Sequence, residues 1–479
     1  MKKFKLFITS LSLILLIVIF SGCATSNLLD YVSNNTETDY ASVLPKDGTN
    51  GIDGKDGKDG DQIDLFEVYS KLVELEEFGG TYSDFVKEYL NTKESVYATN
   101  KALTSVVDVY AGHTETITYQ ANFMQTAQFI EKSYGAGSGV IFRLDKETGD
   151  AYIITNYHVV YSSSADENIS QDISIFVYGK EDFDVETVDS VNDIYGNQYS
   201  YKNITGQNKI SATYLGGSML YDIAVLKVSG SEILKQSDAQ EATFANSDKI
   251  IVGEGVVAVG NASSMGLSAT QGIVSVDSEY ISMLGVDNQT VCTFRVIRTD
   301  SAVNGGNSGG GLFNEDGEVV GIVNAKITSS SIENIAYAIP SNIAVNVAKN
   351  IIRNCDGQEK LTVQRCLLGI GLKALSSSAV YDQASLCTRI EEKVAVASIT
   401  QGSLSEGLLE VGDILTSVTI NYANGQSTTK QIKRTFTLVD LSLTLSVGDT
   451  LILERTAHDG TQKTDVEVTF SSESVSEFA

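Results

Sequence analysis

Short apolar runs separated by polar turns recur along this chain of 479 residues and predict a mainly β protein. One run, Ala151–Ile154, leads into Thr155-Asn156-Tyr157-His158, and another opens at Tyr221 and extends to Val228. Farther on, two apolar runs within 311–325 flank the sequence Asn-Glu-Asp-Gly. A polar, glycine-containing link of this kind predicts a β-hairpin.

Helical spacing of apolar residues occurs in two other places. Between residues 65 and 92 the apolar positions form two sets on either side of Gly79-Gly80, and Thr81 or Ser83 can cap the second helix. We interpret 65–95 as a small helical element that serves as a spacer or a docking element. An amphipathic helix is also predicted from about Ile343 to Asn354.

Ser308 stands in the run Asn304-Gly305-Gly306-Asn307-Ser308-Gly309-Gly310. Glycine permits the positive φ angles of a tight turn whose N–H groups point into one small space. An acyl-transfer enzyme needs its weak nucleophile beside such donors, because they stabilise the oxyanion that the attack creates. The same run also describes an ordinary surface loop, so two further segments decide between these interpretations.

His158 follows a predicted strand, and Asp222 opens another. The chain has only three histidines. A buried aspartate can orient a histidine and stabilise the imidazolium that forms when it accepts a serine proton. Taken singly, His158 is better explained as a core histidine and Asp222 as a turn or strand-end residue. Together with Ser308, in the order His, Asp, Ser, they favour a catalytic triad.

These three segments resemble the catalytic boxes of the HtrA/Deg serine proteases, a trypsin-like family. The resemblance continues outside the boxes, through Ala245–Asp248, Val252–Asn261, Thr270–Ser275 and Arg298–Asn304. It runs from about Ala102 to Lys349 and implies a trypsin-like domain of two six-stranded β-barrels, which we bound at 96–355. It also implies that His158 is the general base, Asp222 its orienting partner and Ser308 the nucleophile. The backbone N–H groups of Gly306, Ser308 and Asn307 would form the oxyanion hole.

Two features modify this picture. His158 and Asp222 are 64 positions apart (222 − 158), longer than is usual for bacterial members of the family. The surplus in 162–209 is polar and predicts extended surface loops with short strands such as 173–178. It is either a decorative insertion or a loop that covers the site or contacts a second subunit.

In the family the strand at 322–325 lines the specificity pocket. Ile322, Val323 and Asn324 include no acid, which favours small or aliphatic residues before the cleaved bond.

Residues 361–475 resemble a PDZ domain. Leu368-Gly369-Ile370 would form the peptide-binding loop, supported by Gly402–Leu409 and by Val411-Gly412-Asp413-Ile414. In a PDZ domain, a peptide adds a strand to a sheet edge and backbone N–H groups bind its terminal carboxylate. The alternative is a β domain of another kind.

Charge and composition limit the partners. The net charge of −27 argues against nucleic acid and against electrostatic adhesion to anionic lipid. Cys292, Cys355, Cys366 and Cys387 are irregularly spaced with no Cys-x-x-Cys, so no zinc site is expected. They permit two disulfides or buried thiols, and the chemistry of a serine protease requires no metal or organic cofactor.

Membrane attachment is expected from the N-terminus instead. Lysines precede an apolar stretch from Leu6 to Phe20, and Ser21-Gly22-Cys23 resembles a bacterial lipobox. We predict a signal peptide at 1–22 and lipidation of Cys23; an uncleaved anchor is the alternative. Glycine recurs at every third position from Gly48 to Gly60 without proline, so 23–64 is predicted to be a flexible tether rather than collagen.

The sequence therefore predicts a lipid-anchored, extracytoplasmic serine endopeptidase. Its expected substrates are unfolded or damaged exported proteins, with C-terminal tails bound by the PDZ groove. A homotrimer is expected from the resemblance alone. A non-catalytic chaperone or binding module of the same fold is the main rival function, and a surface adhesin is another.

Overall fold

A computed structural model describes residues 65–74, 79, 81, 94–165, 168–325, 335–354, 362–383 and 386–478. The chain divides into two units, Met1–Tyr97 and Ala98–Ala479. In the first, helix α3 spans Leu65–Glu74, within the predicted helical element. The predicted signal peptide, Cys23, the tether and most of the second predicted helix lie outside the described residues. No helix among the described residues is long and apolar enough to cross a bilayer.

Helix α5 (Glu94–Leu103) spans the boundary between the two units, and a six-stranded ring follows it in the second unit. The sheet order β1-β4-β7-β8-β3-β2 is closed into a barrel by pairing of β1 with β2. Inward-facing aliphatic residues such as Ile141, Ile153 and Leu226 are fully buried inside it. The strands are β1 (Val106–Asn122), β2 (Gln125–Asp145), β3 (Asp150–Thr155), β4 (Ile173–Val177), β7 (Ile210–Ser218) and β8 (Ile223–Val228).

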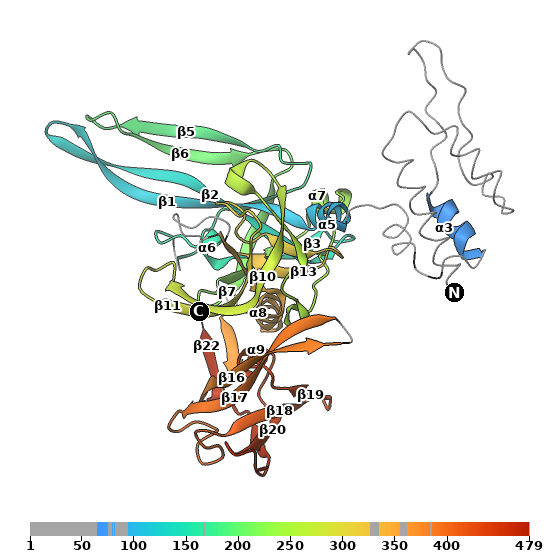
Figure 1. The fold of residues 1–479 in the computed structure, drawn as a ribbon. Coiled ribbons are helices and arrows are strands. Elements are labelled where there is room, and N and C mark those ends of the chain that lie inside the picture. The colour runs from blue at the N-terminus through green and yellow to red at the C-terminus, as the bar shows by residue number, and fades with distance from the viewer. Residues whose placement is uncertain are drawn as a thin grey trace, which may run out of the picture. The chain divides into compact units, whose positions relative to one another are not determined.

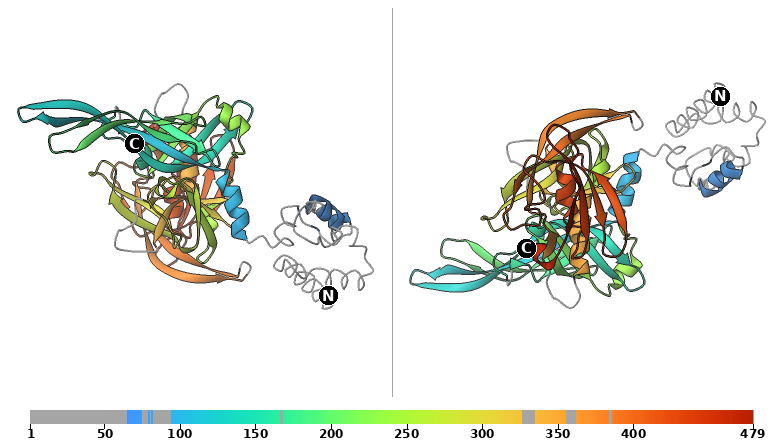
Figure 2. Two further views of the ribbon diagram at one scale, coloured as in Figure 1. Left: turned by 90° about the horizontal axis from the view of Figure 1, so that it is seen from above. Right: turned by 90° about the horizontal axis from the view of Figure 1, so that it is seen from below.

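A long hairpin extends from this barrel. The outer parts of β1 and β2 continue past the ring, and β5 (Asp184–Asn192) and β6 (Gln198–Thr205) lie beside them (Figure 1). The views from above and below show the same arrangement (Figure 2). β6 pairs with β2 at a single position, Lys132 with Tyr201. The polar segment 162–209 therefore supplies one barrel strand, β4, and the β5–β6 hairpin.

The second barrel is closed in the order β10-β11-β14-β13-β12-β9. Its strands are β9 (Gly255–Gly260), β10 (Ser268–Leu284), β11 (Val291–Thr299), β12 (Gly311–Asn314), β13 (Val319–Val323) and β14 (Ala336–Pro340). β12 and β13 form the hairpin predicted from the Asn-Glu-Asp-Gly link. Helix α8 (Ser341–Arg353) packs Ile343, Val347 and Ile351 into a core shared by the two barrels. The chain is mainly β, and its two six-stranded barrels confirm the predicted fold class.

A separate core holds the C-terminal part together. One sheet has the order β16-β17-β18-β20-β21, with β19 paired to β18, and β15 pairs with β22. β16 therefore lies at one edge of its sheet. The elements are β15 (Val363–Cys366), β16 (Ile370–Asp382), β17 (Cys387–Ile399), β18 (Ile414–Asn421), β19 (Ser427–Gln431), α9 (Phe436–Leu441), β20 (Thr450–Thr456), β21 (Val466–Thr469) and β22 (Val475–Phe478). Cys366 is a buried free thiol, and Cys355 lies outside the described residues.

Arg295 on β11 joins the second barrel to this C-terminal part. It is 2% exposed, and its Nη2 lies 2.9 Å from Asp248 Oδ1 and 2.9 Å from Asp440 Oδ2. Its guanidinium carbon is 3.8 Å from the ring centroid of Phe436, so it also stacks on that aromatic face. A buried charge is tolerated only with such partners, and removal of one partner is strongly destabilising.

Asp108 on β1 is buried without a partner. It is 0% exposed, and neither carboxylate oxygen has a hydrogen bond among the described residues. Burial, with a smaller contribution from Glu181, raises the pKa of Asp108 from 3.8 to about 8. The folded protein therefore retains a proton that the unfolded chain releases between these two pH values.

This asymmetry predicts that stability falls as pH rises from about 4 to about 8. The slope from this one group is on the order of 1 kcal/mol per pH unit. Asp108→Asn, which cannot ionise, should flatten that slope and raise the unfolding temperature relative to wild type at pH 8 but not at pH 4. Thermal unfolding followed by circular dichroism at several pH values checks this. Parallel curves for the two proteins would contradict it.

Candidate active site

His158 lies on α6 (Tyr157–Val160), a short helix that directly follows β3. Its ring Nδ1 is 2.7 Å from Asp222 Oδ2, and its backbone N–H donates to Asp222 Oδ1 at 2.9 Å. The side chain of Asn156 donates to the backbone oxygen of Asp222 at 2.8 Å. These contacts, made across 64 to 66 positions of sequence, fix the imidazole and the carboxylate relative to each other.

Asp222 precedes β8 in a left-handed backbone conformation, with φ of 50°. Aspartate tolerates this region better than most residues, and such strain persists where surrounding contacts hold it. Besides His158, the carboxylate accepts a hydrogen bond from Asn324 Nδ2 at 2.8 Å. The carboxylate is thus held by the first barrel and by the strand end of the second barrel.

Ser308 lies in the segment between β11 and β12 of the second barrel. Its backbone oxygen accepts from Ser138 N at 2.7 Å, and Gly309 N donates to Val323 O at 3.0 Å. Gly309 has φ of 85°, and an added Cβ would lie 2.1 Å from Ser138 O, so the turn requires glycine there. Ser308 is 5% exposed, and its Oγ accepts from Ala325 N at 3.1 Å.

The side chains of His158 and Ser308 are not hydrogen-bonded to each other in the described structure. Catalytic hydrogen bonds are often long in free enzymes and tighten when substrate binds. Ser308 Oγ would have to leave Ala325 N and turn toward His158 to give up its proton. The geometry therefore brings the base and the aspartate into contact, while the hydroxyl of the nucleophile is hydrogen-bonded to Ala325 N.

The loop before Ser308 presents two N–H groups with no protein acceptor among the described residues, those of Gly306 and Ser308. The N–H of Asn307 donates to Asn304 O at 3.1 Å. Two converging free donors are what an oxyanion requires. Of the three residues predicted for the oxyanion hole, Gly306 and Ser308 thus have available donors in this conformation.

Ser138 holds this loop in place. Its Oγ donates to Gly306 O at 2.8 Å and accepts from Asn261 N at 2.8 Å. Sequence reasoning missed Ser138 and Asn261, because the contact between Ser138 and Gly306 spans 168 positions. The run Gly135-Ala136-Gly137-Ser138-Gly139 was the available signal, since close backbone approach is a use of glycine.

The residues predicted to line the specificity pocket turn their side chains inward. Ile322 is buried in the core shared by the barrels, and Val323 in the core of the second barrel. Asn324 is fully buried, with its amide on Asp222. Because these side chains are buried, only the backbone of this strand end can contact a substrate. Residues 326–334 lie outside the described part of the chain. The aliphatic preference stays a prediction.

Asn324 is best tested as a positioning residue. Asn324→Ala removes a hydrogen bond to the carboxylate, and we expect kcat/KM for a peptide to fall about tenfold. Asn324→Ser, which keeps a donor, should recover part of the activity. An Asn324→Ala protein with the wild-type kcat/KM would contradict this role.

The predicted peptide-binding loop of the C-terminal part lies beside the edge strand β16. Gly369 has φ of 73°, and its oxygen accepts from Thr400 N at 2.8 Å. Leu368 and Ile370 are half-buried against the C-terminal core. No residue of the triad belongs to this loop, which is a separate candidate site.

Comparison with known proteins finds sequences similar to the double-barrel region. Residues 137–322, which include His158, Asp222 and Ser308, match the family model described as a trypsin-like peptidase domain. The Serine protease Do-like HtrA of Lactococcus lactis subsp. cremoris is 34% identical over 292 residues, covering 59% of this chain and 60% of that protein. The protein of the same name from Bacillus subtilis is 32% identical over 278 residues, covering 57% of this chain and 51% of the relative.

This chain thus spans between half and two thirds of the length of these curated relatives. Among solved structures, the HtrA-type protease AlgW with a decapeptide aligns at 21% identity with a TM-score of 0.45, covering 79% of this chain and 98% of that one.

Proposed function

We propose that the chain is a serine endopeptidase, because residues 137–322 match the family model of a trypsin-like peptidase domain. The observation that carries the proposal is the pair His158–Asp222, joined at 2.7 Å beside a serine loop with two free N–H donors. The names of the sequence relatives, which are serine proteases, support it.

The proposed reaction begins when Ser308 Oγ attacks the peptide carbonyl carbon and His158 accepts its proton. Asp222 keeps Nδ1 protonated and stabilises the imidazolium. The carbonyl oxygen becomes an oxyanion between the N–H groups of Gly306 and Ser308. The C–N bond then breaks, His158 protonates the leaving nitrogen, and an acyl-enzyme remains. Water, deprotonated by His158, releases the second product and restores Ser308.

Substrates are proposed to be unfolded or damaged exported proteins, and a small or aliphatic residue is proposed to precede the cleaved bond. The edge strand β16 and the loop at Gly369 support binding of a peptide C-terminus by strand addition. The lipobox-like Ser21-Gly22-Cys23 supports tethering to the outer face of the cell membrane. A homotrimer is proposed only from the family resemblance.

A second function deserves a test because of one observation. Ser308 Oγ is hydrogen-bonded to Ala325 N rather than to His158. This is the geometry expected of a resting or inactive site. A non-catalytic chaperone or binding module would share the fold and the peptide-binding loop. Such a protein would retain its role when Ser308 is replaced.

Labelling with a fluorophosphonate separates the two functions. The chain from residue 24 onward is treated with and without an unfolded protein, and the adduct is located by mass spectrometry. An endopeptidase should carry a single adduct on Ser308, and Ser308→Ala should carry none. A folded wild-type protein that stays unlabelled under both conditions would favour the binding module.

A further inference from the structure

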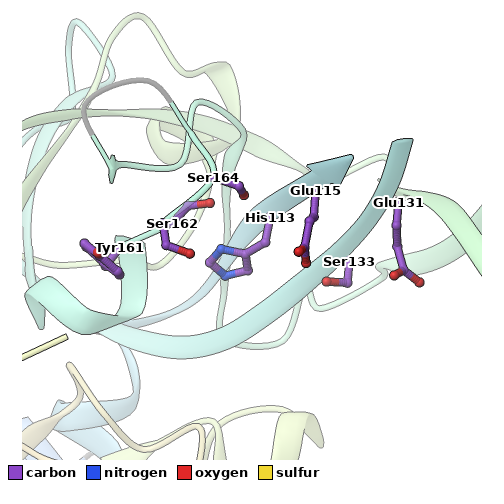
Figure 3. A pocket seen from close by; sticks show the side chains of 8 residues that line it. His113, Glu115, Glu131, Ser133, Tyr161, Ser162 and Ser164 are labelled. Atoms are coloured by element: carbon purple, nitrogen blue, oxygen red, sulfur yellow. The ribbon is translucent and has the colours of Figure 1, made fainter. Parts of the chain in front are cut away.

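A cavity of about 260 Å³ lies where the long hairpin leaves the first barrel. Its lining comes from three segments: β1, β2 and the chain that follows α6 (Figure 3). We call it the hairpin cavity, and it is lined mainly by His113, Glu115, Glu131, Ser133, Tyr161 and Ser162. None of these residues belongs to the triad or to the oxyanion loop.

Two glutamates lie opposite each other on the two strands of the hairpin. Glu115 pairs directly with Glu131 in the β1–β2 register, and His113 pairs with Ser133. Like charges in directly opposed positions are destabilising without a counter-ion. Neither glutamate has an ion pair in the described part of the chain, although Glu131 accepts a hydrogen bond from Ser200 N at 3.4 Å. The cavity therefore offers unneutralised negative charge.

Ser162 supplies an independent sign of a ligand. Its side chain lines the cavity opposite His113 (Figure 3). It is 3% exposed, and its Oγ has no hydrogen-bond partner among the described residues. A buried hydroxyl without a partner costs free energy that a bound donor would recover. The loop is held in place, because Ser164 Oγ donates to Thr114 O and Ser162 N donates to Asn168 O at 2.8 Å.

Two of the segments that line the hairpin cavity also lead to the catalytic site along the chain. Ser162 lies four positions after His158, the residue that protonates the leaving nitrogen. On β2, a Cβ added to Gly137 would meet Val159 at 2.6 Å and Ser308 O at 3.2 Å. Ser133 projects from the same face of β2 as Gly137, since their positions differ by an even number.

β2 has an edge on which an extended chain could be added. It pairs with β3 from Val140 onward and with β6 at Lys132, so the stretch between them pairs only with β1 in the described sheet. The stretch ends at Ser138, whose N–H reaches Ser308 O at 2.7 Å. A substrate leaving the scissile bond along this edge would run antiparallel to β2, with alternate side chains on the face of the cavity.

We propose that the hairpin cavity binds a lysine or arginine side chain of the substrate, about four residues beyond the cleaved bond. The inference rests on the proposed endopeptidase function. Glu115 and Glu131 neutralise the cation, and Ser162 Oγ accepts one of its N–H groups. Burial lowers the pKa of His113, so its imidazole is neutral at pH 7 and does not repel the cation.

A basic side chain fits this site better than a metal ion does. Among the described residues, no group of three His, Cys, Asp or Glu side chains is placed to hold a metal. Two carboxylates, a hydroxyl and a neutral imidazole instead provide several acceptors for an ammonium or guanidinium group.

The test uses quenched peptides that carry one lysine at successive positions after the cleaved bond, with norleucine peptides as uncharged references. We expect lysine to raise kcat/KM about tenfold near the fourth position. In Glu115→Gln/Glu131→Gln the ratio of lysine to norleucine should fall to about one. Glu186→Gln, which removes an exposed charge from β5 outside the cavity, should keep the wild-type ratio.

Failure of the two proposals can be told apart. Cleavage of the norleucine peptides with no lysine preference at any position would overturn the proposal for the hairpin cavity. The same result would still support the proposed endopeptidase function. A second measurement needs no hydrolysis: fluorescence anisotropy of Ser308→Ala with labelled lysine and norleucine peptides. Equal affinities for the two peptides would overturn the cavity proposal even if no peptide is cleaved. Tighter binding of the lysine peptide, abolished in the double glutamine variant, supports it.

Discussion

An Asp222→Asn variant should cleave peptides about 10⁴-fold more slowly than the wild type at pH 7. The carboxylate accepts hydrogen bonds from the backbone and the ring of His158 and from Asn324. An asparagine has nearly the same shape, but its NH₂ can donate where the carboxylate could only accept. Turned toward Nδ1, that NH₂ would move the imidazole proton to Nε2, which then cannot accept the proton of Ser308.

The measurement is kcat/KM for a peptide, together with the rate of fluorophosphonate labelling. Asp150→Asn is the matched control, because Asp150 also accepts a backbone hydrogen bond, from Gly230 N at 2.7 Å, and stands at the opposite end of β3 from His158. Near-normal unfolding temperatures in both variants would exclude misfolding. An Asp222→Asn protein with activity within tenfold of wild type would contradict the assigned role.

Gly306→Ala should reduce the labelling and hydrolysis rates by about 10²- to 10³-fold. Gly306 has φ of 96°, and an added Cβ would lie 2.0 Å from Asn261 O. Because that contact is with backbone, the loop has to move, and the N–H of Gly306 moves with it. The oxyanion would then lose one of its two donors.

The neighbouring glycine is a close control. A Cβ added to Gly305 meets nothing within 4 Å, so Gly305→Ala should retain activity. Ser138→Ala offers a milder change, since it removes the hydrogen bond to Gly306 O without adding bulk. Equal losses in Gly305→Ala and Gly306→Ala would show that the loop geometry, as described, is not what activity requires.

The sequence could predict the elements whose signal is local. The strand before His158, the strand after Asp222 and the β12–β13 hairpin each combine an apolar run with a turn or a polar residue, and all three are present in the fold. Because α8 buries one face, its apolar residues recur with helical spacing in the sequence. The bounds of the helix are therefore close to those predicted.

Contacts between distant segments could not be predicted in this way. Asn324 and Asp222 are 102 positions apart, and nothing in the sequence indicates in which direction the side chain of Asn324 points. The outer half of the β1–β2 hairpin was missed for another reason. Both of its faces are largely exposed, and Phe123 and Met124 at the tip are 90% and 94% exposed. Without a buried face there is no alternation of apolar and polar residues to reveal a strand.

The buried position of Arg295 has a consequence for dissecting this protein. A fragment that ends after α8 would lose Asp440 and Phe436 and leave the guanidinium with Asp248 alone. Such a fragment would differ from the intact chain in the stability of its second barrel as well as in the absence of the proposed peptide-binding part. Any loss of activity on truncation would therefore mix two causes. Point substitutions at Gly369 would separate them, because they leave the Arg295 contacts in place.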